Sequence, residues 1–263
     1  MTATSDDSKW TEESIWDIRY WTDTLLSFKI TRPAQYLFKP GHYSRLGLQD
    51  EHGQLIWRAY SVVSAPAEDF LEYYGVIVPG GMFTSRLKQL RPGDRIYLDK
   101  QAFGFMTADR FTDGDTLWML ATGTGLGPFI SILRDGAVWK QFRQLVLVHG
   151  ARHVADLSYT NELQAIQASQ AHGGSQLQLF QSVTRDGDGT PLPAGVLHGR
   201  ITTLLENGRL EQAAGHAITP EGARVMLCGN PAMIEETRAL LHSRDMRPLR
   251  RASPGHFVAE NYW

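Results

Sequence analysis

The chain has 263 residues, of which 42% are hydrophobic and 21% charged, and its formal net charge at pH 7 is −2. A net charge so close to zero gives no general attraction to nucleic acid or anionic lipid, so we expect neither a nucleic-acid nor a membrane partner. No apolar run is long enough to cross a bilayer, and residues 1–14 lack the form of a secretion signal. We therefore expect a cytoplasmic protein. The single cysteine, Cys228, excludes an internal disulfide and a cysteine-ligated iron–sulfur cluster, and we expect no metal centre.

The first part of the chain, residues 1–107, is predicted to form an antiparallel β-barrel or sandwich. Its apolar residues fall into short runs that are rich in β-branched and aromatic residues and are separated by turn residues. These runs are 25–30, 43–48, 55–63, 70–78 and 95–99. One helix is expected among them, over residues 83–90, with Thr84 as its N-cap.

The second part, residues 108–263, is predicted to be an α/β domain with a parallel sheet. Continuous apolar strands alternate here with amphipathic helices, which is typical of a parallel sheet covered on both faces. The expected strands are 116–121, 145–150, 177–183 and 224–229, and the expected helices are 128–142, 159–170, 201–208 and 231–246. The length of the chain also favours two domains, because each part is large enough to bury its own core.

A glycine-rich loop follows the first parallel strand directly. In the stretch ATGTGLGPF, Gly123, Gly125 and Gly127 lie on a strand-to-helix turn, and Pro128 takes the first helical position. Glycines let the backbone approach a ligand closely, and a helix N-terminus offers unpaired N–H groups and a positive dipole end to a pyrophosphate. The loop therefore predicts a dinucleotide site, although such a loop can also serve only tight packing.

Three arginines are predicted to lie at one edge of the parallel sheet. Arg152 follows the strand 145–150, Arg185 follows the strand 177–183, and Arg200 opens the next helix. Ligands of open parallel sheets bind beyond the carboxyl ends of the strands, and guanidinium groups bind phosphate in bidentate fashion. The three together predict a site for a doubly charged phosphate such as the 2′-phosphate of NADP. Each one taken singly is also compatible with an ordinary solvated arginine.

Several motifs occur in order along the chain: RAYS at residues 58–61, GGMFTSRL at 80–87, TGTGLGP at 122–128, CGNPAM at 228–233 and the terminal AENYW. Together they resemble the ferredoxin-NADP reductase family, in particular the bacterial ferredoxin/flavodoxin-NADP reductases, over almost the whole chain. The resemblance implies FAD in the barrel domain, NADPH on the parallel sheet and the flavin in the cleft between them. It also implies hydride transfer from NADPH to FAD, followed by single-electron transfer to an acidic ferredoxin or flavodoxin. We expect a monomer.

The resemblance also implies roles for individual residues. Arg58 would pair with the FAD pyrophosphate, Tyr60 would stack on the isoalloxazine, and Ser61 would hydrogen-bond near flavin N5. The residues implied for FAD are Arg58, Ala59, Tyr60, Ser61, Met82, Phe83, Thr84, Thr124, Tyr262 and Trp263. Those implied for NADP are Thr122, Gly123, Gly125, Gly127, Arg152, Arg185, Arg200 and Cys228.

The aromatic chain end has two interpretations. An exposed aromatic pair is unusual in a terminus, and the resemblance implies that Tyr262 lies against the flavin and Trp263 against the adenine. From the residues alone, the preferred interpretation is that the pair fills a hydrophobic gap or a dimer contact. Glu260 would relay a proton or orient the nicotinamide, and Cys228 would adjoin it, although a cysteine at a strand end is also typical of a small buried hydrophobe. The implied catalytic residues are Ser61, Cys228, Glu260 and Tyr262.

The densest basic run in the chain contains Arg244, Arg247, Arg250 and Arg251. We expect it to dock an acidic carrier, although a solvated helix end is the ordinary explanation for such a run. Two other functions remain compatible with the sequence. One is an NAD(P)H-dependent flavin reductase or the reductase component of an oxygenase, and the other is a nucleotide-binding module without turnover.

Overall fold

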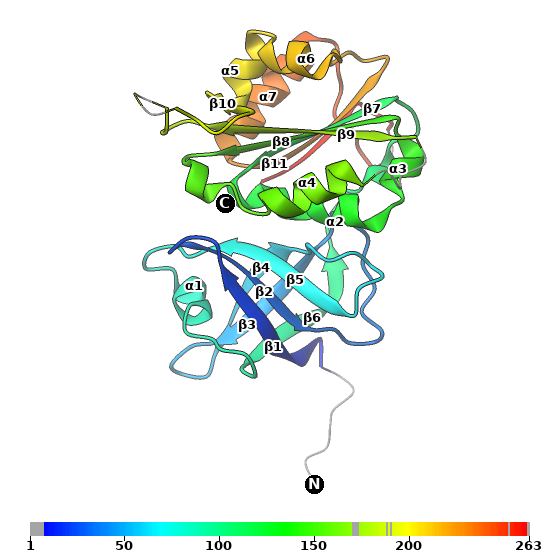
Figure 1. Cartoon of the computed structure of the whole chain (residues 1–263). Coiled ribbons are helices and arrows are strands. Elements are labelled where there is room, and N and C mark those ends of the chain that lie inside the picture. The colour runs from blue at the N-terminus through cyan, green and yellow to red at the C-terminus, as the bar shows by residue number, and fades with distance from the viewer. Residues whose placement is uncertain (1–7, 170–173, 188, 190, 252, 262–263) are drawn as a thin grey trace.

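The computed structural model describes residues 8–169, 174–187, 189, 191–251 and 253–261. They form two sheets of six strands each, one antiparallel and one parallel, which lie one above the other in Figure 1. The predicted fold class is therefore confirmed. The domain boundary between residues 107 and 108 remains a prediction.

The antiparallel sheet is built from the first six strands, in the order β4-β3-β6-β1-β2-β5. Their bounds are β1 (Trp10–Tyr20), β2 (Leu25–Thr31), β3 (Tyr43–Gln49), β4 (Leu55–Ser61), β5 (Phe70–Val76) and β6 (Arg95–Phe103). A bridge between Val62, directly after β4, and Tyr73, in the middle of β5, joins the two edge strands and closes the sheet into a barrel. The interior is filled by buried aromatic and aliphatic side chains such as Phe28, Leu46 and Tyr73. The short apolar runs correctly predicted five of these strands, whereas β1 was not predicted.

The parallel sheet has the order β10-β9-β8-β7-β11-β12. Its strands are β7 (Thr116–Thr122), β8 (Gln144–Ala151), β9 (Gln176–Val183), β10 (Val196–His198), β11 (Ala223–Gly229) and β12 (Phe257–Asn261). Every neighbouring pair is parallel, as continuous apolar strands predict. β10 and β12 are the edge strands, and neither was among the predicted strands.

Helices cover both faces of the parallel sheet (Figure 1). The face toward the barrel carries α2 (Gly127–Asp135), α3 (Val138–Gln141) and α4 (Thr160–Ala168), and the opposite face carries α5 (Ile201–Glu206), α6 (Arg209–Ala214) and α7 (Pro231–Ser243). The helix predicted over 128–142 is divided into α2 and α3 because Gly136 takes the left-handed conformation, with φ 81°, and caps α2. Short 3₁₀ turns complete the part: η1 (Ala108–Arg110), η2 (Gly123–Leu126) and η3 (Val154–Asp156).

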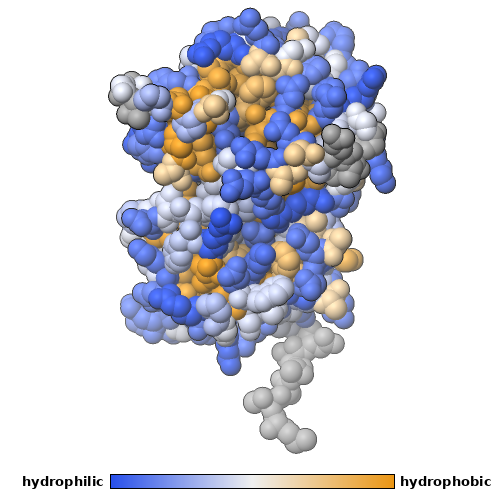
Figure 2. Space-filling view, in the orientation of Figure 1, coloured by the Kyte–Doolittle hydropathy of each residue, from blue (hydrophilic) through white to orange (hydrophobic). Residues whose placement is uncertain are grey.

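A shared hydrophobic core joins the barrel to the parallel sheet. Val63, Tyr74 and Met106 from the barrel side belong to one buried cluster with Phe129 and Leu133 of α2. A second cluster lies under α5, α6 and α7 on the other face of the sheet. Figure 2 shows hydrophilic residues over much of the visible surface, with hydrophobic groups between them in both parts. In the part of the chain that the structure describes, no helix has the length and apolar character needed to cross a membrane.

Candidate functional site

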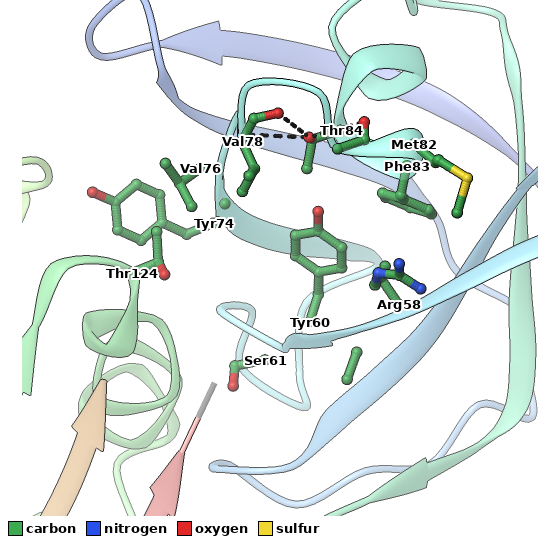
Figure 3. A pocket seen from close by; sticks show the side chains of 13 residues that line it. Arg58, Tyr60, Ser61, Tyr74, Val76, Val78, Met82, Phe83, Thr84 and Thr124 are labelled. Carbon is green, nitrogen blue, oxygen red and sulfur yellow. Dashed lines mark hydrogen bonds between the residues drawn. The ribbon is translucent and has the colours of Figure 1, made fainter. Parts of the chain in front are cut away.

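A cavity of about 370 Å³ opens where the barrel meets the first loop of the parallel sheet (Figure 3). It is lined by residues of β4, β5, α1 (Met82–Leu87) and the glycine loop: Arg58, Ala59, Tyr60, Ser61, Tyr74, Gly75, Val76, Val78, Gly81, Met82, Phe83, Thr84 and Thr124. Every residue that the resemblance implied for FAD is in this set, except the two at the chain end. The fold thus brings together residues from three separate stretches of the sequence around one space.

Tyr60 lies at the centre of the group of residues that line the cavity (Figure 3). Its ring contacts Phe83 at a centroid distance of 5.5 Å and lies over Gly75 of β5. A Cβ at Gly75 would lie only 2.7 Å from the Tyr60 ring, so any larger residue at this position of β5 would displace the ring. Burial raises the pKa of the Tyr60 hydroxyl, which therefore stays protonated. The ring is held as a flat, neutral surface at the side of the cavity.

The residues of β5 that line the cavity were not predicted as site residues. Tyr74, Gly75 and Val76 lie within the predicted strand 70–78 and form the wall next to Tyr60. A glycine inside an otherwise apolar strand often marks a close approach of another group. That signal was present in the sequence, but only the closure of the barrel, which brings the end of β4 to β5, identifies Tyr60 as the group.

Arg58 and the start of α1 provide the positive charge of the cavity. Arg58 is exposed, its guanidinium donates to the carbonyl of Trp57 at 2.8 Å, and no described acidic side chain pairs with it. Within α1, the first i to i−4 hydrogen bond runs from the N–H of Ser85 to the carbonyl of Gly81. The three preceding N–H groups, of Met82, Phe83 and Thr84, come before that ladder begins, as at any helix N-terminus. An anionic group near Arg58 could accept from them.

Thr84 was predicted to be the N-cap of this helix, and this prediction is wrong. The N-cap is Gly81, and α1 begins two residues before Thr84. The Thr84 hydroxyl reaches back over the first turn, accepts from the N–H of Val78 at 3.1 Å and donates to its carbonyl at 3.1 Å (Figure 3). The Thr84 side chain therefore joins the segment after β5 to the first turn of α1. It does so from inside the helix and not from the N-cap position.

Ser61 is the last residue of β4 and points its hydroxyl into the junction of the two parts. Its side chain is 6% exposed, and its Oγ is buried without a hydrogen-bond partner among the described residues. An unsatisfied buried hydroxyl costs on the order of 1–3 kcal/mol, so a polar ligand atom in the cavity would relieve that cost. A Cβ added at Gly127 would lie 3.7 Å from the Cβ of Ser61, which shows how closely α2 approaches this strand end.

The three glycines of the loop have different environments. At Gly125, a Cβ would collide with the backbone carbonyl of Cys228, so this glycine serves tight packing against β11. At Gly127, a Cβ would lie 3.3 Å from the Val63 side chain. Gly123 has φ 54° and open space around its Cα, so it is the one of the three that leaves room for a ligand. The loop thus combines both of the interpretations that its sequence allowed.

Thr122 and Thr124 flank Gly123 on either side and serve different parts of the site. The hydroxyl of Thr122 accepts a hydrogen bond of 2.8 Å from the N–H of Asn230, which fixes the loop after β11 to the end of β7. Thr124 lines the cavity close to Tyr74 (Figure 3). Its position is therefore compatible with contact to a ligand that lies on the barrel.

The three predicted arginines follow β8, β9 and β10, which are adjacent in the sheet. Arg152 and Arg185 are exposed, and the N–H of Arg185 donates to the carbonyl of Arg152 at 2.9 Å. Neither forms a salt bridge with a described residue, whereas Arg200 pairs with Glu236 of α7 at 2.8 Å. Two guanidinium groups at this edge are thus available to an anion, and the third would have to exchange its partner.

Cys228 and Glu260 lie side by side in the register of the sheet. Cys228 pairs with Ala121 on β7 and with Glu260 on β12, so the three side chains share one face. That face is the one toward the barrel, because Ala121 and Cys228 belong to the core that the two parts share. Cys228 itself is fully buried.

Glu260 connects the parallel sheet to the loop after β6. Its Oε1 accepts a hydrogen bond of 2.9 Å from the N–H of Phe105. Burial raises the pKa of this carboxyl, partly opposed by the backbone hydrogen bonds from Phe105 and Met106. A carboxyl with a raised pKa can hold a proton under conditions where ordinary glutamates cannot, which suits a group that passes protons.

Tyr262 and Trp263, which the resemblance implied at the flavin and the adenine, lie outside the described residues, and their roles stay predictions. The described chain ends with Asn261, which pairs with Gly229 at the carboxyl end of β11. Within the predicted basic run, Arg244 donates to both carboxylate oxygens of Glu211 at 2.9 Å, so its charge is used within the fold. Arg247, Arg250 and Arg251 are exposed.

Comparisons with known proteins agree over nearly the whole chain. Residues 20–100 match the oxidoreductase FAD-binding domain family, and residues 119–239 match the oxidoreductase NAD-binding domain family. The flavodoxin/ferredoxin–NADP reductase of Shigella flexneri is 41% identical over 255 residues, which cover 97% of this chain and 99% of the relative. The ferredoxin–NADP reductase of Pseudomonas aeruginosa is 34% identical, with coverage of 94% and 95%. A solved ferredoxin NADP⁺ reductase from Neisseria gonorrhoeae, with bound FAD and NADP, is 37% identical and matches at a TM-score of 0.90, covering 98% of this chain and 100% of that one.

Proposed function

Since the chain belongs to the flavodoxin/ferredoxin–NADP reductase family, we propose that it is an FAD-dependent enzyme that moves electrons from NADPH to ferredoxin or flavodoxin. One observation carries the proposal: a single cavity is lined by the residues of β4 that the resemblance assigns to FAD, by the start of α1 and by Thr124 of the nucleotide loop. A dinucleotide on the loop and a flavin in the cavity would therefore meet at the junction of the two parts. FAD, when bound, accepts a hydride and releases the two electrons one at a time.

The residues of the cavity fit a flavin dinucleotide. The Tyr60 ring offers a flat, neutral surface for stacking, and exposed Arg58 offers an unpaired charge for a pyrophosphate next to the N–H groups of Met82 and Phe83. The unsatisfied hydroxyl of Ser61 would hydrogen-bond the edge of the ring system. Glu260, on the same side of the molecule, would hold or pass a proton at its Oε atoms.

The nucleotide half fits NADPH for similar reasons. Gly123 leaves open space at the turn into α2, where a pyrophosphate would meet a helix N-terminus. Arg152 and Arg185 would bind the 2′-phosphate, with Arg200 released from Glu236 as a third contact. Cys228 would adjoin the nicotinamide from its place in the sheet beside Glu260. At the chain end, Tyr262 would lie against the flavin face and Trp263 against the adenine.

We propose an acidic ferredoxin or flavodoxin as the partner and a monomer in the cytoplasm as the state of the enzyme. The exposed arginines Arg247, Arg250 and Arg251 support local steering of an acidic carrier, which the net charge of −2 alone would not provide. The domain division at residues 107 and 108 fits the two sheets, since β6 ends at Phe103 and β7 begins at Thr116.

An anaerobic titration of the purified protein with NADPH, and separately with NADH, tests the proposal. The visible flavin bands should bleach at far lower concentrations of NADPH than of NADH. The variant carrying Arg152→Ala and Arg185→Ala should lose this preference. Each charge-assisted hydrogen bond to the phosphate contributes about 1.5–3 kcal/mol, so the half-saturating NADPH concentration should rise at least about tenfold, with little change for NADH.

Three other outcomes would count against parts of the proposal. Equal losses for both nucleotides in the double variant would remove the 2′-phosphate assignment. Equal bleaching of the parent protein by both would retain the flavoenzyme and remove the preference for NADPH. A yellow protein that neither nucleotide bleaches would favour a nucleotide-binding module without turnover.

A further inference from the structure

A buried carboxylate of the barrel is bound by two separate segments of the parallel half. Glu72 lies on β5 and is only 5% exposed. Its Oε2 accepts a hydrogen bond of 2.8 Å from Arg134, near the end of α2, and its Oε1 accepts one of 2.8 Å from the hydroxyl of Tyr159. Each oxygen of the carboxylate therefore has a donor from across the junction. A buried charge is tolerated only when it is paired and hydrogen-bonded in this way.

Arg134 extends the contact over a wider part of the barrel. Its guanidinium also donates to the carbonyl of Val63 at 3.2 Å and to Glu162 of α4 at 2.7 Å, and it lies 3.6 Å from Glu68. One turn earlier on the same helix, Ser131 donates to the carbonyl of Ser64 at 2.6 Å. α2 is thus bound at two points to Val63 and Ser64, which follow the end of β4. No residue of this set lines the cavity.

Tyr159 is held in an unusual backbone conformation. Its φ is 60°, and among the described residues only Asp245 is another non-glycine residue with a positive φ. Bulky residues adopt the left-handed region only where the surroundings enforce it. Here the ring packs on Trp21 and Tyr74 of the barrel side at centroid distances of 4.5 and 5.3 Å, and burial raises the pKa of its hydroxyl. The strained position brings that hydroxyl to Glu72.

The two segments that Glu72 binds both lead to the nucleotide site. α2 begins at Gly127, directly after the open turn at Gly123, so its position sets where that turn lies. Tyr159 ends the segment that begins with Arg152, and the neighbouring Ser158 accepts a hydrogen bond of 2.9 Å from Tyr74, which lines the cavity. On the barrel side, β5 runs from Glu72 to the cavity wall at Gly75. One carboxylate thus connects the flavin-side wall to both nucleotide-side segments.

We propose that Glu72 is a positioning residue for hydride transfer: it fixes the nucleotide turn and the Arg152 segment at a set distance from the flavin cavity. The proposal rests on the proposed function, because it assigns Glu72 to the step between NADPH and FAD. Glu72 itself touches neither of the two proposed cofactor sites. Transfer rates depend steeply on the separation of the reacting atoms, and a displacement of about 1 Å can cost on the order of 100-fold.

The test is the substitution Glu72→Gln, with Glu211→Gln as a matched control. Both carboxylate oxygens of Glu72 accept hydrogen bonds, so the amide of glutamine must place a donor against Arg134 or Tyr159. Glu211 is similarly engaged, by Arg244 on both oxygens and by the N–H of Ile218, but all of these contacts lie within the parallel half. A second variant, Tyr159→Phe, removes one hydroxyl and keeps the ring, so that a failure of Glu72→Gln to fold would not end the test.

The measurements are the FAD content, the dissociation constant of NADP⁺ and the stopped-flow rate of anaerobic flavin bleaching at saturating NADPH. We expect Glu72→Gln and Tyr159→Phe to slow bleaching by about tenfold and about threefold, while FAD content and NADP⁺ affinity stay within about twofold of the parent. Glu211→Gln should lower the melting temperature and leave the bleaching rate of the FAD-loaded protein unchanged. This separates positioning from stability, because a structural role would change the melting temperature in both cases and the saturated rate in neither.

Unchanged bleaching rates in Glu72→Gln and Tyr159→Phe, beside a parent that NADPH bleaches, would overturn the inference and leave the proposed function intact. Equal slowing in Glu211→Gln would also overturn it, because the effect would then be one of general destabilisation. A parent protein that NADPH does not bleach would instead refute the proposed function.

Discussion

The contact between Gly75 and Tyr60 gives a direct test of the flavin cavity. In the substitution Gly75→Ala, the new Cβ would lie 2.7 Å from the Tyr60 ring, whereas ordinary contact begins at 3.4 Å. Gly75 is not in the left-handed region, so the backbone can accept alanine and the ring must move, by about 0.7 Å. Phe83 limits the ring on one side, and the cavity is open on another. The ring should therefore shift into the space that we assign to FAD.

The expected loss follows from the stacking contact that the shift disturbs. An aromatic stack contributes about 0.5–1.5 kcal/mol beyond the area it buries, so its loss should raise the dissociation constant of FAD by about 2- to 12-fold. Overpacking of a core costs about 1–3 kcal/mol in stability, and the lower end applies here because the ring can move toward open space. The assay is dilution of the purified yellow protein, in which the fluorescence of released FAD reports the dissociation constant.

Gly222→Ala is the matched control, because a Cβ there meets no atom within 4 Å and the residue has no positive φ. The same Gly75→Ala change in a Tyr60→Ala background completes the cycle and should have no further effect on FAD release, since the ring is absent. If Gly75→Ala retained FAD as firmly as Gly222→Ala, or weakened FAD equally without the Tyr60 ring, the stacking role of Tyr60 would be refuted.

Two further predictions concern Glu260 and the basic run. Burial raises the pKa of Glu260 above 4.5, so its stabilising contribution is present below pH 4.5 and is lost as the pH rises through the raised pKa. Between these two pH values, urea unfolding should show Glu260→Gln gaining stability relative to the parent protein. Stability curves of the two proteins that run parallel with pH would contradict this. Reversing Arg250 and Arg251 to glutamate should slow reduction of an acidic carrier and flatten its salt dependence without affecting reduction of a small dye, and unchanged carrier kinetics would exclude these arginines as the docking site.

The sequence predicted the strands whose apolar residues stand out and missed those whose residues are mixed. β1 mixes polar residues with apolar ones, and most of its side chains are exposed; it is held by its pairing with β2 and β6. β10 has only three residues. β12 has five and was read as part of the chain end, although it joins the sheet beside β11. Such strands depend on partners that are distant in sequence, which local periodicity does not detect.

The same limit applies to the site. The motif at residues 58–61 and the glycine loop each have a local signature, so their residues could be named in advance, and the structure brings them to one cavity. By contrast, nothing near Glu72 in the sequence indicates Arg134 or Tyr159, because the three meet only when the barrel packs on α2 and α4. Likewise, Gly125 belongs to a ligand-binding motif but is required by the carbonyl of Cys228, a contact between η2 and β11, which lie far apart in the chain.

The paired bonds of Glu72 bear on how enzymes of this fold can be recombined. A chimaera that joins the barrel of one reductase to the nucleotide half of another would inherit the carboxylate from one parent and its two donors from the other. Unless both parents have residues equivalent to Glu72, Arg134 and Tyr159, the hybrid would either bury a carboxylate without its two donors or leave Arg134 with Glu162 of its own half but no partner at Glu72. The two halves are separate sheets, but because of these contacts they can be exchanged between reductases only when the residues that form the contacts match.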